Sequence, residues 1–188
     1  VAKAWRRALP STAVLARHGG TATTSDLAML GATPAQVRRL ARGADMAELE
    51  ALVSTCAACR RLVRWREDVA RDKRAAFADQ PYWGRPAPGW GDPHPRALIV
   101  GLAPAAHGAN RTGRPFTGDA SGEALFAGLD RHGLARGHRP GSAGEGVDLI
   151  GTAITNAVRC VPPENRPVAA EINACRAYLE PTLARFAK

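Results

Sequence analysis

The sequence predicts an α/β protein with three layers, in which helices cover both faces of a central, mostly parallel sheet, preceded by a small helical module. Short apolar runs rich in branched residues occur at Arg96–Gly101 and Leu149–Arg159, as in buried strands. Apolar residues at helical spacing follow at Ser121–His132 and Pro167–Phe186. The order strand, loop, helix, strand, helix is typical of a three-layer α/β sheet.

The N-terminal region, residues 1–45, is expected to be a module of its own. It contains two predicted short helices, Ser25–Leu30 and Pro34–Arg42, with helix-turn-helix spacing. The stretch VLARHGGTATTSDLAMLGATPAQVRRLARG resembles the winged-helix region of some abortive-infection antitoxins, whose second helix meets DNA. An amphipathic helical pair packed on the main domain explains the spacing equally well, as does an upstream reading frame fused to a main domain spanning residues 46–188.

The overall charge favours a polyanionic partner. The chain has 26 Lys and Arg residues against 17 Asp and Glu, a net charge of +9, and Arg binds phosphate through a planar fork of donors. No apolar run approaches the ~18 to 20 residues that a membrane span needs. We therefore expect a cytoplasmic monomer that binds nucleic acid and no membrane.

Three further segments complete the prediction of local structure. Ala47–Arg74 is predicted to be helical with an interruption near its cysteines. Gln80–Pro95 is rich in Pro, Gly and Trp, which favours an irregular loop with aromatic anchors. Arg136–Gly146 is predicted to be a glycine-rich surface loop.

The four cysteines form two local pairs. Cys56 and Cys59 are separated by two residues, and Cys160 and Cys175 by fourteen. Such pairs more often bind metal than form disulfides in an intracellular protein. Spacing alone leaves zinc and a 4Fe-4S cluster equally open, and four unrelated buried thiols are the simpler alternative.

The segment Gly101–Gly122 is a candidate ligand-binding loop. Its sequence, GLAPAAHGANRTGRPFTGDASG, is dense in small residues that let the backbone approach a ligand. It follows a strand, and ligands of open α/β sheets bind at the carboxyl ends of strands. Its length also favours a function over a simple connection.

Three separated motifs then identify a resemblance. The run GLAPAAHGANRTGRPFTGD, the later TNAVRCVPPENRP and the cysteine pairs resemble the iron-sulfur branch of the uracil-DNA glycosylase superfamily, closest to its family 5. The resemblance extends from about Met46 to Lys188. It implies hydrolysis of the N-glycosidic bond of uracil, or other deaminated bases, in DNA. It also implies a structural 4Fe-4S cluster held by Cys56, Cys59, Cys160 and Cys175.

The resemblance implies two base-binding residues. Phe116, in GRPF, matches the aromatic ring on which the flipped base stacks. Asn156, in TNAVRC, matches the amide that offers a donor and an acceptor to the Watson–Crick edge of uracil. A ring in the core and a cap at a strand end are the respective alternatives.

The catalytic residues are harder to assign. Leu102 occupies the position where relatives outside family 5 carry a polar residue. Asp119, in FTGD, resembles the carboxylate proposed to orient water, although an Asp before a helix is also a natural N-cap. Asn110 is a second catalytic candidate. Further candidates in the loop are Ala103 and His107 for substrate, and Arg111 and Arg114 for DNA phosphates.

One departure from the family concerns the C-terminal part. The family pattern continues beyond the position of Lys188 with further strands and a loop bearing a His motif, which no His of this sequence matches. From this we expect a fragment, a frameshifted gene product or a truncated record, and, if this is the whole protein, poor stability and little or no glycosylase activity. Alternatives are a non-catalytic DNA-binding protein or degenerate glycosylase, and an unrelated zinc-stabilised α/β domain.

Overall fold

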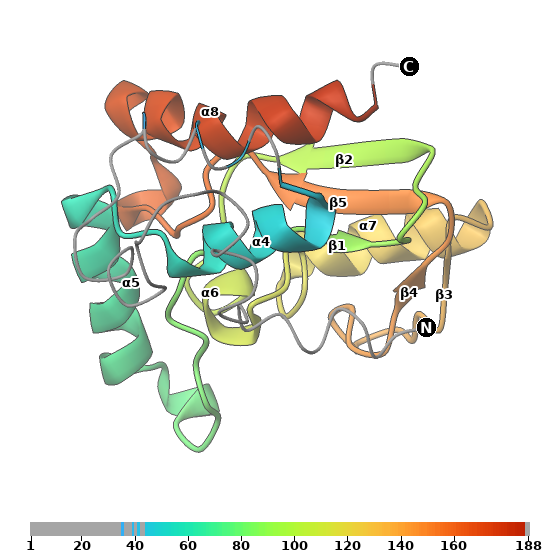
Figure 1. Cartoon of the computed structure of the whole chain (residues 1–188). Helices are drawn as coiled ribbons and strands as arrows, with labels where there is room; N and C mark the ends of the chain where they lie inside the picture. Colours follow the sequence, from blue (N-terminus) through green and yellow to red (C-terminus); the bar gives the residue numbers. More distant parts are fainter. Residues whose placement is uncertain (1–34, 36–38, 40, 42–43, 187–188) are drawn as a thin grey trace.

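A small mixed sheet forms the centre of the protein (Figure 1). The structure is a computed structural model that describes residues 35, 39, 41 and 44–186. The sheet has the order β1-β5-β2, with β1 at Trp90–Gly91, β2 at Ala97–Gly101 and β5 at Thr152–Asn156. Strand β2 runs parallel to β5, whereas β1 is antiparallel to it. The predicted α/β class is confirmed, and β1 is an addition within a segment predicted to be irregular.

The second predicted strand, Leu149–Arg159, is wrong in its extent. It divides into β4, Asp148–Leu149, and β5, because Gly151 adopts a φ of +58° that bends the chain between them. Strand β4 pairs antiparallel with β3, Ala135–Arg136, in a separate two-stranded ribbon. All five residues of β5 are buried, so this strand is the centre of the sheet.

Strand β2 is less buried than its apolar sequence predicts. It lies at the edge of the described sheet, and Val100 is 42% exposed. The predicted strand at Arg96–Gly101 is confirmed, but its predicted burial is wrong. An apolar run of this length does not distinguish a central strand from an edge strand, because both bury at least one face.

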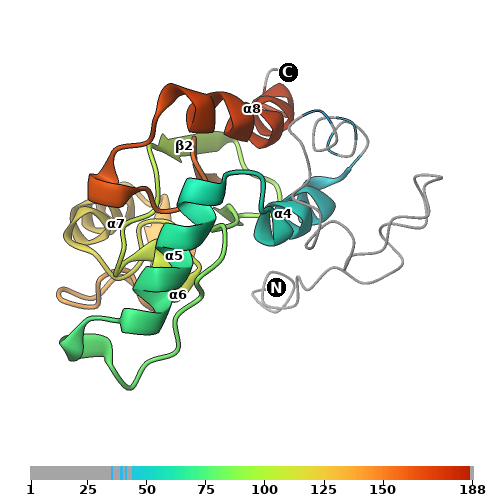
Figure 2. The same cartoon turned by 90° about the vertical axis from the view of Figure 1, so that its left-hand side faces the viewer.

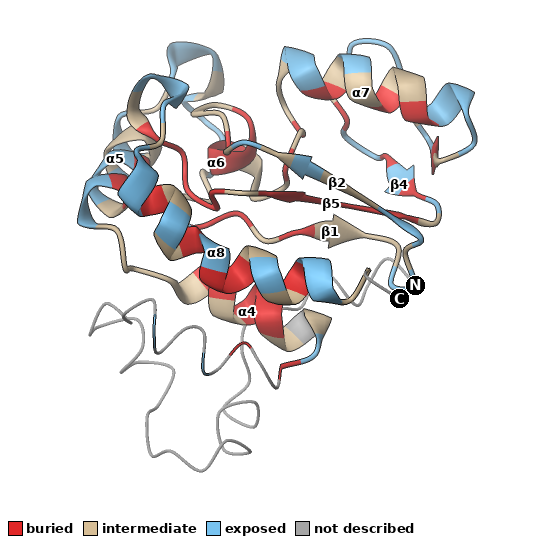
Figure 3. Ribbon diagram, turned by 90° about the horizontal axis from the view of Figure 1, so that it is seen from above, coloured by how far each residue is buried: buried red, intermediate tan, exposed pale blue. Residues whose placement is uncertain are grey.

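Helices lie on both sides of the sheet (Figure 3). Helices α4 and α8 lie on one side, and α7 lies on the other. Helix α5 lies beside α6 at the end of the sheet where β2 and β5 finish (Figure 2). The bounds are α4 Met46–Thr55, α5 Arg60–Asp72, α6 Ala109–Thr112, α7 Ala120–Arg131 and α8 Ala169–Ala184, with 3-10 turns η2 Ala75–Phe77 and η3 Pro163–Asn165.

Several helix predictions are confirmed. The predicted helix Ala47–Arg74 is interrupted at the cysteines, where α4 ends and α5 begins. Helix α4 starts with a reciprocal cap, in which Asp45 accepts from the Glu48 amide and Glu48 accepts from the Asp45 amide. The predicted helices Ser25–Leu30 and Pro34–Arg42 fall outside the described residues except at positions 35, 39 and 41. Among the described helices, none has the length and apolar character to cross a membrane.

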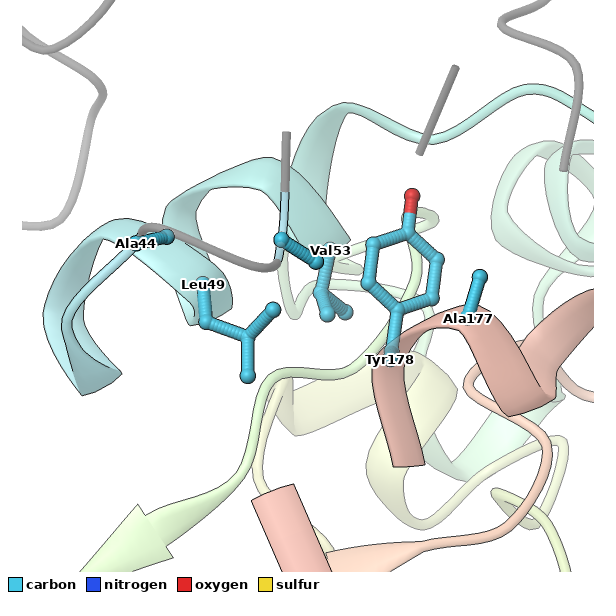
Figure 4. Close-up of a cluster of buried hydrophobic side chains, with 6 residues drawn as sticks. Ala44, Leu49, Val53, Ala177 and Tyr178 are labelled. Atoms are coloured by element: carbon cyan, nitrogen blue, oxygen red, sulfur yellow. The ribbon is translucent and has the colours of Figure 1, made fainter. Parts of the chain in front are cut away.

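Apolar side chains join α4 to α8 (Figure 4). Leu49 and Val53 of α4 are fully buried against Ala177 and Tyr178 of α8. Figure 4 shows the Tyr178 ring between the two helices. This packing attaches the last helix to the segment that precedes the first cysteine pair.

An ion pair also joins α5 to α8. Arg61 Nε and Nη2 donate to Glu171 Oε1 and Oε2 at 2.8 and 2.9 Å, and the Val168 amide donates to Glu171 Oε2 at 3.0 Å. Burial by itself raises the pKa of Glu171, but these hydrogen bonds and the Arg61 charge outweigh it and lower the pKa below its ordinary value. The carboxylate of Glu171 therefore stabilises the folded protein above the pKa it has in the unfolded chain.

We expect Glu171→Gln to flatten the acid-induced loss of stability. A carboxyl group with a lowered pKa in the folded state contributes stability that is present above about pH 4.3 and is lost as the pH falls through the folded-state pKa. The variant should thus be less stable than wild type at pH 7, with a smaller difference at pH 3. Urea unfolding at both pH values measures this. Glu180→Gln, at an exposed position of the same helix, should match wild type at both, and a pH-independent deficit in Glu171→Gln would contradict the expectation.

Candidate active site and cysteine site

The parallel strands β2 and β5 bring the two glycosylase-like motifs together. Gly101 at the end of β2 pairs in register with Asn156 at the end of β5. The amide of Ala157 donates to the Gly101 carbonyl at 2.8 Å, which continues the pairing past the strands. Residues 55 positions apart in the sequence thus lie at one edge of the sheet, as ligand sites of α/β sheets do.

Phe116 and Asn156 meet over Gly101. A Cβ atom built on Gly101 would lie 2.4 Å from Asn156 Oδ1 and 2.8 Å from Phe116 Cε2. The aromatic ring and the amide therefore occupy the space where any side chain at position 101 would stand. Asn156 is buried and Phe116 is half-buried, and the ring also packs against the core around Phe126. The two predicted base-binding residues are neighbours.

The backbone of Phe116 is held in an unusual conformation. Its φ is +60°, a region in which a bulky residue is strained by roughly 1–3 kcal/mol. Its carbonyl lies against Gly122 in the first turn of α7, where an added Cβ would be 1.7 Å from the Phe116 oxygen. Close approach of helix and loop sets the position of the ring.

Asp119 is the N-cap of α7, and this alternative interpretation is confirmed. Its Oδ1 accepts from the Gly122 amide at 2.9 Å. Its Oδ2 lies over Gly108, where an added Cβ would be 2.5 Å from that oxygen. The second oxygen has no hydrogen bond to the described protein residues, so a catalytic role for Asp119 stays a prediction compatible with the cap.

Asn110 faces helix α5. It is 1% exposed, and its Nδ2 donates to the Arg66 carbonyl at 3.2 Å. Its Oδ1 is buried with no hydrogen-bond partner among the described residues. Its amide hydrogen bond fastens the loop to α5, and its predicted catalytic role is not tested by this contact.

The other loop candidates lie near the sheet and α5. Ala103 packs against the apolar cluster that contains Cys160 and Cys175. His107 Nδ1 is 2.9 Å from Tyr82 Oη. Burial, together with the nearby Arg74 and Arg111 charges, lowers the pKa of His107.

The two arginines predicted to bind phosphate make contacts within the protein. Arg111 is buried, donates from Nε to the His107 carbonyl at 2.8 Å and lies 4.2 Å from the Phe77 ring centroid. Arg114 lies 3.5 Å from the Trp90 ring centroid and donates to the Val147 carbonyl. These contacts order the loop, and a role in phosphate binding stays a prediction for both residues.

All four cysteines gather at one site, although they come from four segments. Cys56 follows α4, Cys59 caps α5, Cys160 follows β5 and Cys175 lies on α8. All four are free thiols. Burial, and then the neighbouring Cys175 and Cys56, raises the pKa of Cys59 to about 12. Burial also raises the pKa of Cys160 to about 12 and that of Cys175 above its usual value.

The four thiols are a donor set that either a structural zinc ion or a 4Fe-4S cluster uses. Within the described part of the chain, no group of three or more His, Cys, Asp or Glu residues is arranged to hold a metal ion. Structural zinc requires four ligands at about 2.0–2.3 Å from one centre. A 4Fe-4S cluster would be held by the same four thiolates.

A buried cation beside the thiols points to negative charge at the site. Arg66 of α5 is 6% exposed, and its Nη1 is 3.2 Å from Cys160 Sγ. A buried guanidinium is costly unless an anionic group compensates it. Thiolates bound to metal would supply that charge, whereas neutral thiols would not.

Comparison with known proteins identifies the family. The model of the uracil DNA glycosylase superfamily matches residues 88–188, more than half of the chain. The chain belongs to this superfamily. The matched region includes both strands that carry Gly101 and Asn156.

Its relatives include several type-5 uracil-DNA glycosylases. The protein of Mycobacterium tuberculosis (strain CDC 1551 / Oshkosh) is 58% identical over 141 residues, which are 74% of this chain and 53% of the relative. That of Mycobacterium leprae is 59% identical over 133 residues, 71% of this chain and 58% of the relative. That of Thermus thermophilus is 53% identical over 135 residues, which are 70% of this chain and 60% of the relative. The chain spans a little over half the length of these relatives.

Sequence reasoning missed three structural contributors to the glycosylase fold. Arg66 was detectable, because it follows the buried Leu62 by four residues and therefore shares its helix face. Gly122 gave a weaker signal, as the third residue after a capping Asp. The buried pair of Glu50 and Arg159 gave none, because 109 residues separate the partners.

Proposed function

We propose that this protein is a uracil-DNA glycosylase, which hydrolyses the bond between uracil and deoxyribose in DNA. The observation that carries the proposal is the meeting of Phe116 and Asn156 over Gly101. A flat ring, a buried amide and a position without a side chain are the parts that a pocket for an extruded base requires. The names of the type-5 relatives agree with this reading.

The base-binding step follows from these side chains. Phe116 offers a ring on which the flipped base stacks, and Asn156 offers an amide donor and acceptor to its Watson–Crick edge. The burial of Asn156 strengthens its hydrogen bonds, because water does not compete for them.

Bond cleavage would depend on charge. The bond from C1′ to uracil N1 breaks with its electron pair leaving on the base, and a water oxygen then bonds to C1′ while its proton goes to solvent. Asp119 Oδ2 would stabilise the positive charge that develops on the sugar. Leu102 is 58% exposed and carries no group able to activate water.

We further propose that the four cysteines hold a 4Fe-4S cluster. When bound, the cluster would cross-link the ends of α4 and α5, the segment after β5, and α8, as a structural centre. The gathering of the thiols and the buried Arg66 support this assignment. The positions of α7 and α8 on opposite sides of the sheet support the proposed three-layer architecture.

The test of the function is excision of uracil. Protein containing iron is incubated with a duplex that holds one uracil, and alkaline cleavage then measures abasic sites; a duplex with thymine at that position is the control. We expect cleavage of the uracil strand alone. Binding without abasic sites would support the alternative of a non-catalytic DNA-binding protein and would overturn the proposal.

We expect Asn156→Asp to reduce uracil excision by about 10- to 100-fold, because an acceptor replaces the donor that faces the base carbonyl, at about 1–3 kcal/mol. Asn165→Asp is the matched control, since Asn165 is exposed on η3. Single-turnover rates of both variants check this. Equal rates would remove Asn156 from the proposed base-binding site.

A further inference from the structure

Arg66 links the cysteine site to the loop of the candidate active site. Its side chain crosses from the middle of α5 to the thiols, where Nη1 donates to the Cys56 carbonyl at 3.0 Å and to Cys160 Sγ at 3.2 Å. The side chain is 7% exposed. The guanidinium thus touches two segments that carry candidate cluster ligands.

Little other charge compensates this cation. Among the described residues, the one carboxylate recorded as its ion-pair partner is that of Glu67, which is 3.9 Å from Nη2 and 59% exposed. An ion pair at this distance, with one partner exposed to solvent, compensates little of the cost of burying the Arg66 charge. Arg66 Nε is buried without a hydrogen-bond partner. The buried contacts of the guanidinium are therefore with the Cys56 carbonyl and the Cys160 sulfur.

The main chain of Arg66 contacts the opposite side. Its carbonyl accepts the 3.2 Å hydrogen bond from Asn110 Nδ2, on α6 within the loop that also carries Phe116 and Asp119. A carbonyl in the middle of a helix already accepts an amide, so this is a second bond to it. Helix α5 also begins directly after Cys59, a candidate cluster ligand.

We propose that Arg66 is a positioning residue that couples the cysteine site to the active-site loop. Its guanidinium donates to the Cys160 thiolate of the bound cluster, and its carbonyl holds the Asn110 amide. Groups that hydrogen-bond to metal ligands tune the metal and its retention. The inference rests on the proposed 4Fe-4S cluster, and its experiments do not depend on glycosylase activity.

The first experiment compares Arg66→Gln and Arg66→Lys with Arg64→Gln, which removes an exposed arginine of the same helix. The reduction potential of the cluster is measured by spectroelectrochemistry, and iron release by a ferrous chelator. We expect a more negative potential in Arg66→Gln, because a cation no longer stabilises the added electron, and iron release about 10–100-fold faster. Arg66→Lys, which keeps the charge, should lie between Arg66→Gln and wild type, and Arg64→Gln should equal wild type.

The second experiment tests the coupling. Amide hydrogen exchange of residues 105–113 is followed by mass spectrometry in wild-type protein before and after removal of the cluster, with residues 135–149 as the remote control. We expect faster exchange in residues 105–113 after removal and a partial increase in Arg66→Gln that retains its cluster.

The outcomes separate the two proposals. Wild-type protein without iron would overturn the cluster and, with it, this inference. Suppose that the wild type contains iron and that both Arg66 variants keep its reduction potential and its rate of iron release. That result would overturn the role of Arg66 but not the cluster. Unchanged exchange in residues 105–113 after cluster removal would overturn the coupling. If Arg66→Gln does not fold, Arg66→Lys still tests the hydrogen bonds of the guanidinium. Lysine keeps the positive charge, so this variant differs from wild type by the loss of the planar guanidinium donors.

Discussion

Replacing Arg159 with methionine is expected to lower the free energy of unfolding by about 3–5 kcal/mol, because it leaves a buried carboxylate without its cation. Arg159 Nη1 donates to Glu50 Oε2 at 3.0 Å, and the two side chains are 1% and 2% exposed. The Gly89 amide also donates to Glu50 Oε2, at 2.7 Å. The pair therefore joins α4, the segment before β1 and the segment after β5.

The surroundings of Arg159 extend the effect to the cysteine site. Its carbonyl accepts from the Ala87 amide at 2.7 Å, and its backbone lowers the pKa of Cys175 against the larger effect of burial. Arg159 also directly precedes Cys160 in the sequence. A shift of this segment would move two candidate ligands at once, so we expect Arg159→Met to retain less iron than wild type.

Urea unfolding of protein with measured iron content checks this expectation. Arg136→Met is the control, because Arg136 and Asp148 form an ion pair 3.6 Å apart with side chains 73% and 53% exposed, and an exposed pair is worth at most about 1 kcal/mol. The double variant Glu50→Leu/Arg159→Met removes both charges and should regain much of the loss. A loss in Arg159→Met no larger than that in Arg136→Met would contradict the argument.

The same pair shows what local sequence patterns could not predict. Glu50 and Arg159 are charged residues in segments that give no sign of burial, and only the folded chain brings them together. The meeting of Gly101 and Asn156 was predictable, since parallel strands end at one edge of a sheet. Two features of the strands were not predictable, because both depend on which strands pair. They are the edge position of β2 and the division of the second predicted strand at Gly151.

The cysteine site was predictable in part. The spacing of Cys56 and Cys59 predicts a metal site, and the interruption of the helix between them follows from it. The contribution of Arg66 was not recognised, because an arginine on an amphipathic helix is usually assigned to its solvated face. Buried cations on otherwise apolar helix faces therefore point to anionic sites when cysteines are near.

Gly122→Ala is expected to have the second large effect, on both stability and excision. The added Cβ would stand 1.7 Å from the Phe116 oxygen and 2.7 Å from its carbonyl carbon. Both neighbours are backbone atoms, so no rotation of a side chain relieves the clash, and the cost should reach about 3 kcal/mol or more. The Gly122 amide also donates to Asp119 Oδ1, so a displaced helix turn would move the carboxylate together with the ring.

Gly128→Ala is the matched control within the same helix. A Cβ on Gly128 would meet nothing within 4 Å, and alanine in a helix interior is favoured over glycine by about 0.5–1 kcal/mol. Gly128→Ala should therefore stabilise the protein and leave excision unchanged. Gly122→Ala should lose about 100-fold in single-turnover excision of uracil, the size expected when a binding group moves by about 1 Å. If the two variants behaved alike in urea unfolding and excision, contact between α7 and the Phe116 carbonyl would not position the ring. If Gly122→Ala lost stability but kept its excision rate, that contact would support the fold alone, and the base would have to be held by groups other than Phe116.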